Sequence, residues 1–204
     1  MDNHQNQLLT YAKLLNDAEE KRIQPIDPIG MICKEITIDD AYAIQLLNIK
    51  DKLSKGGKVS GKKIGLTSLA MQKLLGVEQP DYGHLLEDMK VTNGEIAIDR
   101  MIQPKVEGEI AFILKDDVTG PNATVEDVLS ATDYVVASLE IVDSRIKDWK
   151  INLLDTVADN ASSGLYVLSD NKVKIDNIDL LSIKMSLHKN GELINEGLGK
   201  DVLN

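Results

Sequence analysis

The feature of this sequence that most constrains its fold is a change in the spacing of apolar residues after about residue 55. Before that point the spacing is helical, as in residues 5–22, and Thr37 with Asp40 forms the capping pattern of a second helix that ends by Gly56-Gly57. After it, apolar runs such as "DYVVASLEIVD" are rich in β-branched residues and predict strands. We therefore expect an α+β fold, with a helical region over residues 1–60 and a mixed β core over 61–204.

Several further elements are predicted beyond residue 60 by cap and turn patterns. We expect helices after the caps Ser68 and Thr124, strands near 94–99, 105–115 and in "GLYVLSD", a hairpin around Asn190-Gly191, a polar loop in "EQPDYGHLLEDM" and an irregular stretch over 144–163. The chain stops just after that hairpin, without a closing element. We therefore expect the chain to be truncated at its C-terminus.

The charge and cysteine content exclude several classes of partner. The 204 residues include 33 acids and 23 bases, for a formal net charge of -10, which argues against nucleic-acid binding and a polybasic membrane anchor. Cys33 is the only cysteine, so no disulfide forms within the chain, as is typical of a reducing compartment. With neither a secretory signal nor an apolar run of about 20 residues, the default expectation is a soluble cytoplasmic protein.

Three glutamates fall on predicted strands. In "PKVEGEIAFIL", Glu107 and Glu109 share one face because strand side chains alternate, and Glu140 interrupts the next apolar strand. Carboxylates brought together in a low dielectric repel, so either some are protonated or a cation holds them, and oxygen ligands select Mg²⁺, Mn²⁺ or Ca²⁺. The alternative is that Glu107 and Glu109 lie on the solvated face of a half-buried strand. Glu140 favours the metal site, because so apolar a strand seldom carries an acid.

Other polar residues are weaker candidates when each is taken alone. Lys62 and Lys63 are typical of a solvated pair, although one of them could face a substrate charge. Asp81 and His84 are typical of loop hydrogen-bonding residues, and Ser162 lies in a loop of small residues of the kind that often lines sites.

The motifs together are more specific than any one of them. The chain contains, in this order, "GKKIGLTS", "LGVEQPDYGHL", "IQPKVEGEIAFIL", "LEIVDSRIKDWKI" and "DTVADNASSGLYVL". In these it resembles the 2-keto-4-pentenoate hydratase family of the fumarylacetoacetate hydrolase superfamily, from about Leu8 onward and most specifically over residues 60–168. The resemblance implies a helical N-terminal part and a mixed β-roll core. It also implies Mg²⁺ or Mn²⁺ bound by Glu107, Glu109 and Glu140.

The resemblance further implies an activity and roles for individual residues. The activity is the metal-dependent addition of water to 2-hydroxypenta-2,4-dienoate, giving 4-hydroxy-2-oxopentanoate during the degradation of aromatic compounds. Lys63 and Asp81 would be catalytic, and Leu86 and Ser162 would border the 2-oxo acid substrate. Members of the family form homo-oligomers, and an association with a sister decarboxylase or a downstream aldolase is also implied.

Two alternatives to the hydratase remain open at this stage. The first is the sister activity, decarboxylation of 2-oxo-3-hexenedioate, although "DWKINLLDTVADNAS" is more similar to the hydratase branch. Its dicarboxylate substrate needs an extra cationic contact, for which Lys62, Arg145 and Lys147 are candidates. The second alternative is an inactive truncated chain or a non-catalytic subunit.

Overall fold

The computed structural model describes residues 3–22 and 24–202, and its contacts divide the chain into two compact units. The first, called unit 1 below, comprises Met1–Val106 and Ile141–Leu165, and the second, unit 2, comprises Glu107–Glu140 and Tyr166–Asn204. The chain passes from one unit to the other within strands, and no unit boundary lies near residue 60. The division into a helical region over 1–60 and a mixed β core over 61–204 therefore stays a prediction. Among the described helices, none is long and apolar enough to cross a membrane.

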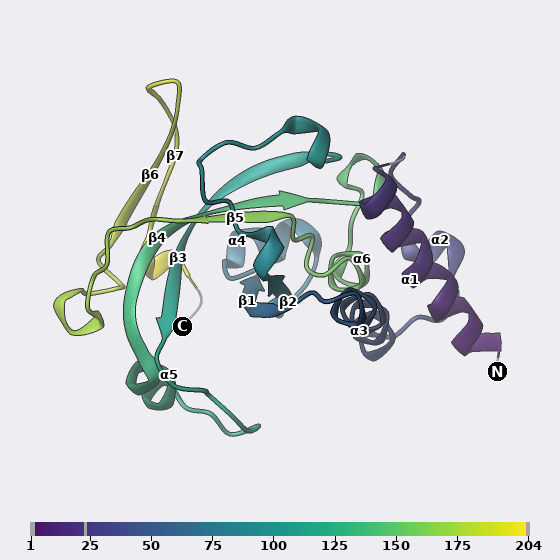
Figure 1. Ribbon diagram of the computed structural model, residues 1–204, viewed down its shortest axis with the longest axis horizontal. Helices are drawn as coiled ribbons and strands as arrows, with labels where there is room; N and C mark the ends of the chain where they lie inside the picture. Colours follow the sequence, from purple (N-terminus) through teal and green to yellow (C-terminus); the bar gives the residue numbers. More distant parts are fainter. Residues whose placement is uncertain (1–2, 23, 203–204) are drawn as a thin grey trace. The chain divides into compact units, whose positions relative to one another are not determined.

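Unit 1 is built around helices whose apolar faces pack together. Helix α3 (Ile38–Ser54) contacts both α1 (Asn3–Lys21) and α6 (Leu153–Ala158), and the short α2 (Ile29–Ile32) lies between α1 and α3 in the sequence (Figure 1). The buried core residues they share are Leu8, Tyr11, Ala12, Leu15, Ile29, Cys33, Ala41, Ile44, Ile146, Val157 and Ala158. Both predicted N-terminal helices are confirmed. Thr37 caps α3, with Asp40 completing the capping box.

A two-stranded ribbon in unit 1 corrects one prediction. Strand β1 (Val59–Gly65) pairs antiparallel with β2 (Asp81–Leu86), and α4 (Leu69–Leu75), capped by Ser68, connects them. The prediction of a polar loop over "EQPDYGHLLEDM" was wrong for 81–86. Asp81 and His84 are buried polar residues, and their side chains are hydrogen-bonded to Thr156 and Gln45. A strand with such partners is stable although its sequence is polar.

The largest sheet has the strand order β3-β4-β5 (Figure 1). Its strands are β3 (Pro104–Leu114), β4 (Thr132–Asp143) and β5 (Leu165–Leu168), all predicted, and α5 (Val125–Ala131) is capped by Thr124 as expected. The strand predicted near 94–99 was wrong. No described strand pairs with that segment, which leads into a 3₁₀ turn at Ile98–Arg100. A segment in which apolar and polar residues alternate forms a strand only when a neighbouring strand pairs with it; without one, its backbone N–H and C=O groups bond to solvent instead.

The remaining described elements are a hairpin and short turns. Strands β6 (Lys184–Lys189) and β7 (Glu192–Leu198) pair around Asn190 and Gly191, whose φ angles of 53° and 85° suit the tight turn that this dipeptide predicts. The irregular stretch predicted over 144–163 was partly wrong, because Asn152 caps α6 within it. Further 3₁₀ turns lie at Glu87–Met89, Lys147–Trp149, Ile175–Asn177 and Gly199–Asp201.

Candidate metal centre and substrate-binding residues

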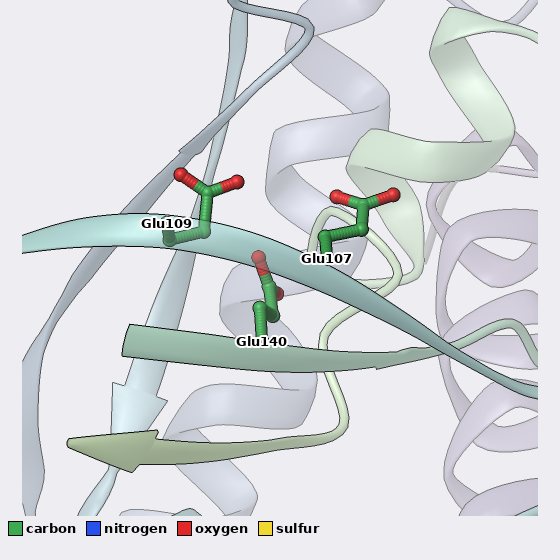
Figure 2. Close-up of side chains that lie close together, drawn as sticks. All are labelled: Glu107, Glu109 and Glu140. Atoms are coloured by element: carbon green, nitrogen blue, oxygen red, sulfur yellow. The ribbon is translucent and has the colours of Figure 1, made fainter. Parts of the chain in front are cut away.

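The three strand glutamates converge in unit 2. Glu107 and Glu109 extend from the same face of β3, and Glu140 extends toward them from the neighbouring strand β4 (Figure 2). One carboxylate oxygen from each lies within 4.8 Å of the other two. Gly108 separates the two β3 glutamates, and a side chain at this position would meet Met185 of β6. On the face of β3 opposite the glutamates, the close approach of β6 is therefore compatible only with a very small residue or a displaced Met185.

The geometry and chemistry of this cluster fit a divalent cation. Calcium and magnesium bind oxygen ligands at about 2.0–2.6 Å, so oxygens around one ion lie up to about 4–5 Å apart. The separation limit of 4.8 Å falls in that range. Glu140 is only 8% exposed, whereas Glu107 is exposed, so the set combines a buried ligand with one open to solvent. Three carboxylates with no nitrogen or sulfur ligand favour hard cations.

A second set of predicted residues is brought together in unit 1. Lys63 of β1 and Asp81 of β2 lie on the same face of the ribbon, since Lys63 pairs with Gly83 and Asp81 with Gly65. Lys63 Nζ donates a hydrogen bond of 2.7 Å to the carbonyl oxygen of Ala161, which precedes Ser162. Lys63, Asp81 and Ser162 thus converge where the ribbon meets the segment after α6.

Burial sets the electrostatic state of Asp81. Its side chain is almost fully buried, and Thr156 Oγ1 donates a hydrogen bond of 3.0 Å to Oδ2. Burial raises the pKa of Asp81 above the ordinary value of an aspartate, although the positive charge of Lys63 and the hydrogen bond from Thr156 act in the opposite direction. Gly65 leaves the space that this carboxyl group occupies, because a side chain there would collide with Oδ1. Asp81 is therefore a shielded acid beside a lysine.

Leu86 lies at the other end of β2 from Asp81. It ends β2 opposite Val59, five residues from Asp81, which is about 17 Å along a strand at about 3.4 Å per residue. Its side chain is buried in the core, and its backbone N–H donates to Met89 Sδ. The structure separates Leu86 from Asp81, and its contact with substrate stays a prediction.

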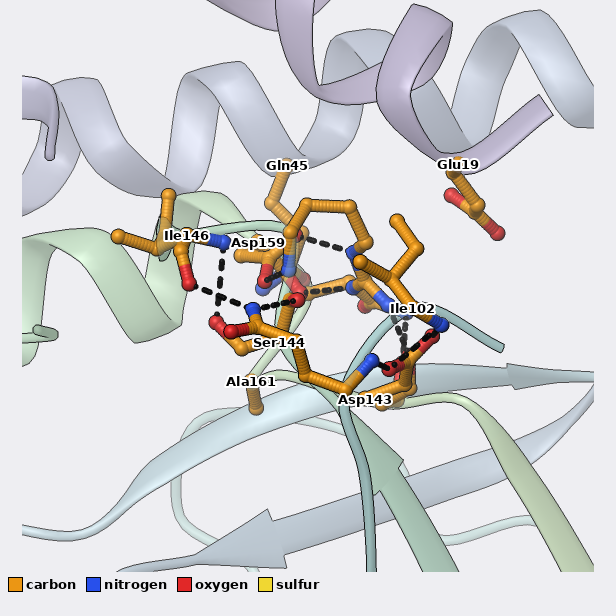
Figure 3. A network of polar contacts seen from close by, with 12 residues as sticks. Glu19, Gln45, Ile102, Asp143, Ser144, Ile146, Asp159 and Ala161 are labelled. Carbon is orange, nitrogen blue, oxygen red and sulfur yellow. Dashed lines mark hydrogen bonds and ion pairs between the residues drawn. The ribbon is translucent and has the colours of Figure 1, made fainter. Parts of the chain in front are cut away.

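A buried ion pair supports the segment that carries Ser162. The guanidinium of Arg145 donates from Nε to Asp159 Oδ1 at 2.5 Å, from Nη2 to Asp159 O at 2.6 Å and from Nη1 to Ser163 O at 2.6 Å. Figure 3 shows Asp159 and Ala161 in this polar network, together with Gln45 of α3. Every guanidinium nitrogen of Arg145 therefore has a partner inside the fold. This arginine is a poor candidate for the extra cation that a dicarboxylate substrate requires.

The comparisons with known proteins give the family. No family model matches the chain. The chain is 50% identical to a 2-hydroxypent-2,4-dienoate hydratase from Pseudomonas putida over 187 residues, covering 91% of this chain and 83% of the relative. It belongs to the 2-keto-4-pentenoate hydratase family. A 2-keto-4-pentenoate hydratase 1 from Dechloromonas aromatica is 51% identical over 166 residues, which are 81% of this chain and 63% of that relative.

Solved structures show the same fold with a divalent ion. A 4-oxalocrotonate decarboxylase from Pseudomonas putida G7, complexed with magnesium and adipate, has a TM-score of 0.91 and 34% identity, covering 98% of this chain and 76% of that chain. A second structure of that decarboxylase, complexed with calcium and acetate, has a TM-score of 0.89. The chain therefore has the fold of the fumarylacetoacetate hydrolase superfamily, and its relatives in this hydratase family are named as hydratases.

Sequence reasoning missed the polar residues that support the hydratase-family motifs. Thr156, which bonds Asp81, was not singled out, and Asn160, which bonds the backbone of β2, was noted only as a member of the small-residue loop that carries Ser162. Their partners lie 75 and 76 residues away in the chain, so no local spacing indicates them. The one available signal was the concentration of small polar residues in "DTVADNASSG".

Proposed function

We propose that this chain is a divalent-metal-dependent hydratase that converts 2-hydroxypenta-2,4-dienoate to 4-hydroxy-2-oxopentanoate. The observation that carries the proposal is the convergence of Glu107, Glu109 and Glu140, whose oxygens lie within 4.8 Å of one another in a chain half identical to a named dienoate hydratase. We propose Mg²⁺ or Mn²⁺ as the ion. Magnesium has the additional support of the solved decarboxylase.

The reaction requires stabilisation of negative charge and the addition of protons to two carbon atoms. Transfer of the 2-hydroxyl proton to C5 converts the dienol into its isomer, a conjugated 2-oxo acid. Water then adds its oxygen at C4 and loses one proton, which leaves negative charge on the 2-oxygen until a proton is added at C3. A divalent ion held by the three glutamates would supply Lewis-acid stabilisation of that charge. The product contains one more water than the substrate, and no oxidant or reductant is needed.

Lys63 and Asp81 are the residues we propose for the proton transfers. The raised pKa of Asp81 suits a group that gains and loses a proton during turnover, and its hydrogen bond from Thr156 fixes the carboxyl group. Lys63 supplies a positive charge for an anionic 2-oxo acid. We propose that Ser162 binds this substrate through its hydroxyl group and that Leu86 borders it.

Two observations favour hydration over the sister decarboxylation. The chain is 50% identical to the dienoate hydratase but 34% identical to the solved decarboxylase. In addition, the guanidinium of Arg145 is committed to Asp159 and Ser163, which removes one of three cations that could have received a second substrate carboxylate.

A product assay tests the proposed function. The protein is freed of metal with a chelator, and 2-hydroxypenta-2,4-dienoate and 2-oxo-3-hexenedioate are supplied separately with Mg²⁺, with Mn²⁺ or with no ion. Products are identified by mass. We expect addition of one water to the first compound, only when an ion is present, and loss of this activity in Glu140→Gln. The matched control is Glu192→Gln, the same substitution on β7 outside the cluster.

Each alternative result has a specific meaning. Loss of carbon dioxide from the second compound, without hydration of the first, would replace the hydratase by the decarboxylase. Hydration that is unaffected by the chelator and by Glu140→Gln would remove the metal assignment. No reaction with either compound would support the inactive-subunit alternative.

We also propose that the chain forms a homo-oligomer and that a sister decarboxylase or a downstream aldolase is a further partner. The support is the family resemblance alone. Light scattering on the purified protein tests the first part, and a single-chain mass at working concentration would contradict it.

A further inference from the structure

Three successive residues in unit 1 have a backbone conformation that side chains normally avoid. Asn160, Ala161 and Ser162 have φ angles of 54°, 53° and 49°. None is a glycine, and positive φ in non-glycine residues is uncommon and is concentrated at functional sites. Such a run persists only where the surrounding structure imposes it, so its contacts show what holds it.

The side chain of Asn160 ties this turn to strand β2. Its Nδ2 donates to His84 O at 2.9 Å and to Ser163 Oγ at 2.6 Å, and its Oδ1 accepts from His84 N at 2.7 Å. Gly83 permits the approach, because a Cβ atom there would lie 2.5 Å from Asn160 O. Asn160 is thus bonded at both ends of its amide, to β2 and across its own turn.

The rest of the turn is fixed through its carbonyl oxygens. Lys63 Nζ donates to Ala161 O at 2.7 Å, Asp143 N donates to Ser162 O at 2.8 Å, and Arg145 Nη1 donates to Ser163 O at 2.6 Å. Three consecutive carbonyl groups are therefore held by residues from β1, β4 and the segment after β4. These hydrogen bonds fix the orientation of the backbone at Ser162.

The hydroxyl group of Ser162 is the exception in this network. The residue is 4% exposed, and its Oγ is buried with no hydrogen-bond partner among the described residues. A buried hydroxyl without a partner costs free energy, and native proteins seldom leave one so unless a ligand completes it. A strained turn whose carbonyl groups are held by neighbouring elements, and which carries one buried hydroxyl without a hydrogen bond, is arranged to present that hydroxyl.

We propose that Asn160 is a positioning residue, which locks the 160–162 turn so that the Ser162 hydroxyl binds the carboxylate or 2-oxo oxygen of a 2-oxo acid. This inference rests on the proposed function for the identity of the ligand. Asn160 acts through Ser162 and does not itself touch the substrate. The two residues form a unit, so their contributions to binding and turnover are not independent.

The test is a double-mutant cycle with two readouts. Asn160→Asp keeps the size and the tolerance of positive φ but loses both Nδ2 donors, and it is combined with Ser162→Ala. The matched control is Asn190→Asp, which makes the same change at a positive φ in the β6–β7 turn. The readouts are kcat/KM for hydration of 2-hydroxypenta-2,4-dienoate and the Kd of 2-oxopentanoate, which has no double bond to hydrate, measured calorimetrically with Mg²⁺.

We expect Asn160→Asp to lower kcat/KM by about 10- to 100-fold, as for a displaced catalytic group. The same substitution should raise the Kd of 2-oxopentanoate. In the Ser162→Ala background the same change should cost less than about 3-fold, because the group it positions is already absent. Asn160→Gly serves as a second variant. Glycine relieves the backbone strain but cannot make the three hydrogen bonds, so we expect it to remain impaired.

The outcomes separate this inference from the proposed function. Equal losses from Asn160→Asp with and without the Ser162 hydroxyl would overturn the inference, as would full activity in Asn160→Gly. If the wild-type chain hydrates nothing but binds 2-oxopentanoate with coupling between the two positions, the inference stands and the proposed function falls. Absence of both turnover and binding in a folded wild-type chain overturns both.

Discussion

Replacing the buried glutamate of the cluster should remove most of the stabilisation that metal binding gives the folded chain. Glu140→Gln keeps the shape of a side chain that is 8% exposed but removes its negative charge, so the fold should persist while the ion loses one of three charged ligands. Because the carboxylate oxygens lie within 4.8 Å of one another, one ion can contact all three, and loss of any one weakens the whole set.

The magnitude follows from mass action. At a metal concentration about 100 times Kd, binding stabilises the folded chain by about 2.7 kcal/mol. For a chain of this size each kcal/mol moves Tm by about 2–4 °C, which gives a rise of about 5–11 °C. Loss of partners outside the coordination shell weakens metal binding by about 10- to 100-fold, so loss of a direct ligand should raise Kd at least about 100-fold. The remaining stabilisation is then about 0.4 kcal/mol, or about 1–2 °C.

The assay is thermal unfolding after removal of metal, repeated over a titration with Mg²⁺, Mn²⁺ and Ca²⁺. Glu192→Gln, an exposed position on β7, should keep the wild-type response and so controls for the change in net charge. A full rise of Tm in Glu140→Gln, or no rise in the wild-type chain with any of the three ions, would refute the metal centre. The experiment needs no substrate and does not depend on the proposed reaction.

Three further predictions concern the polar residues of unit 1. Asp159→Asn leaves the buried Arg145 without its ionised partner and should lower the free energy of unfolding by about 3–5 kcal/mol, measured in urea; a loss below 1 kcal/mol, as for an exposed pair at about 0–1 kcal/mol, would contradict this. Burial lowers the pKa of His84, so as the pH falls the imidazole is protonated in the unfolded chain before it is protonated in the folded chain. The free energy of unfolding should therefore fall as the pH drops below about 6.5 and through the folded pKa. His84→Gln should flatten that fall, and an unchanged pH profile of stability in this variant would contradict the prediction. Gly83→Ala places a Cβ atom 2.5 Å from Asn160 O and should cost about 1–3 kcal/mol in the same urea assay, whereas a neutral effect would show that the turn can move.

Features that depend on neighbours within a few residues could be predicted from the sequence. The capping boxes at Thr37 and Thr124 and the turn at Asn190-Gly191 are of this kind, since the interacting groups lie within four positions of each other. The shared face of Glu107 and Glu109 also follows from strand geometry alone. Their approach to Glu140 needed one further condition, that β3 and β4 are neighbours, which the order of elements favours.

Strand β2 shows why the rest could not be predicted. Its sequence, "DYGHLL", has two polar residues and a glycine, each unfavourable for a buried strand. In the structure each has a compensation supplied from elsewhere: Thr156 bonds Asp81, Gln45 bonds His84, and Gly83 admits Asn160. Gln45 donates to two backbone carbonyls, so its oxygen accepts from His84 Nδ1. The stability of β2 is therefore a property of its partners.

The positive φ angles at 160–162 depend on partners from elsewhere in the chain even more strongly than β2 does. Local preferences oppose this conformation most strongly at Ala161 and Ser162, and contacts from β1, β2 and the end of β4 hold the turn against them. A chain gains nothing in stability from holding a buried hydroxyl without a partner on a strained backbone. A bound 2-oxo acid would complete this hydroxyl, so we seek binding at the position where local rules fail most completely, and the coupling between Asn160 and Ser162 measures it.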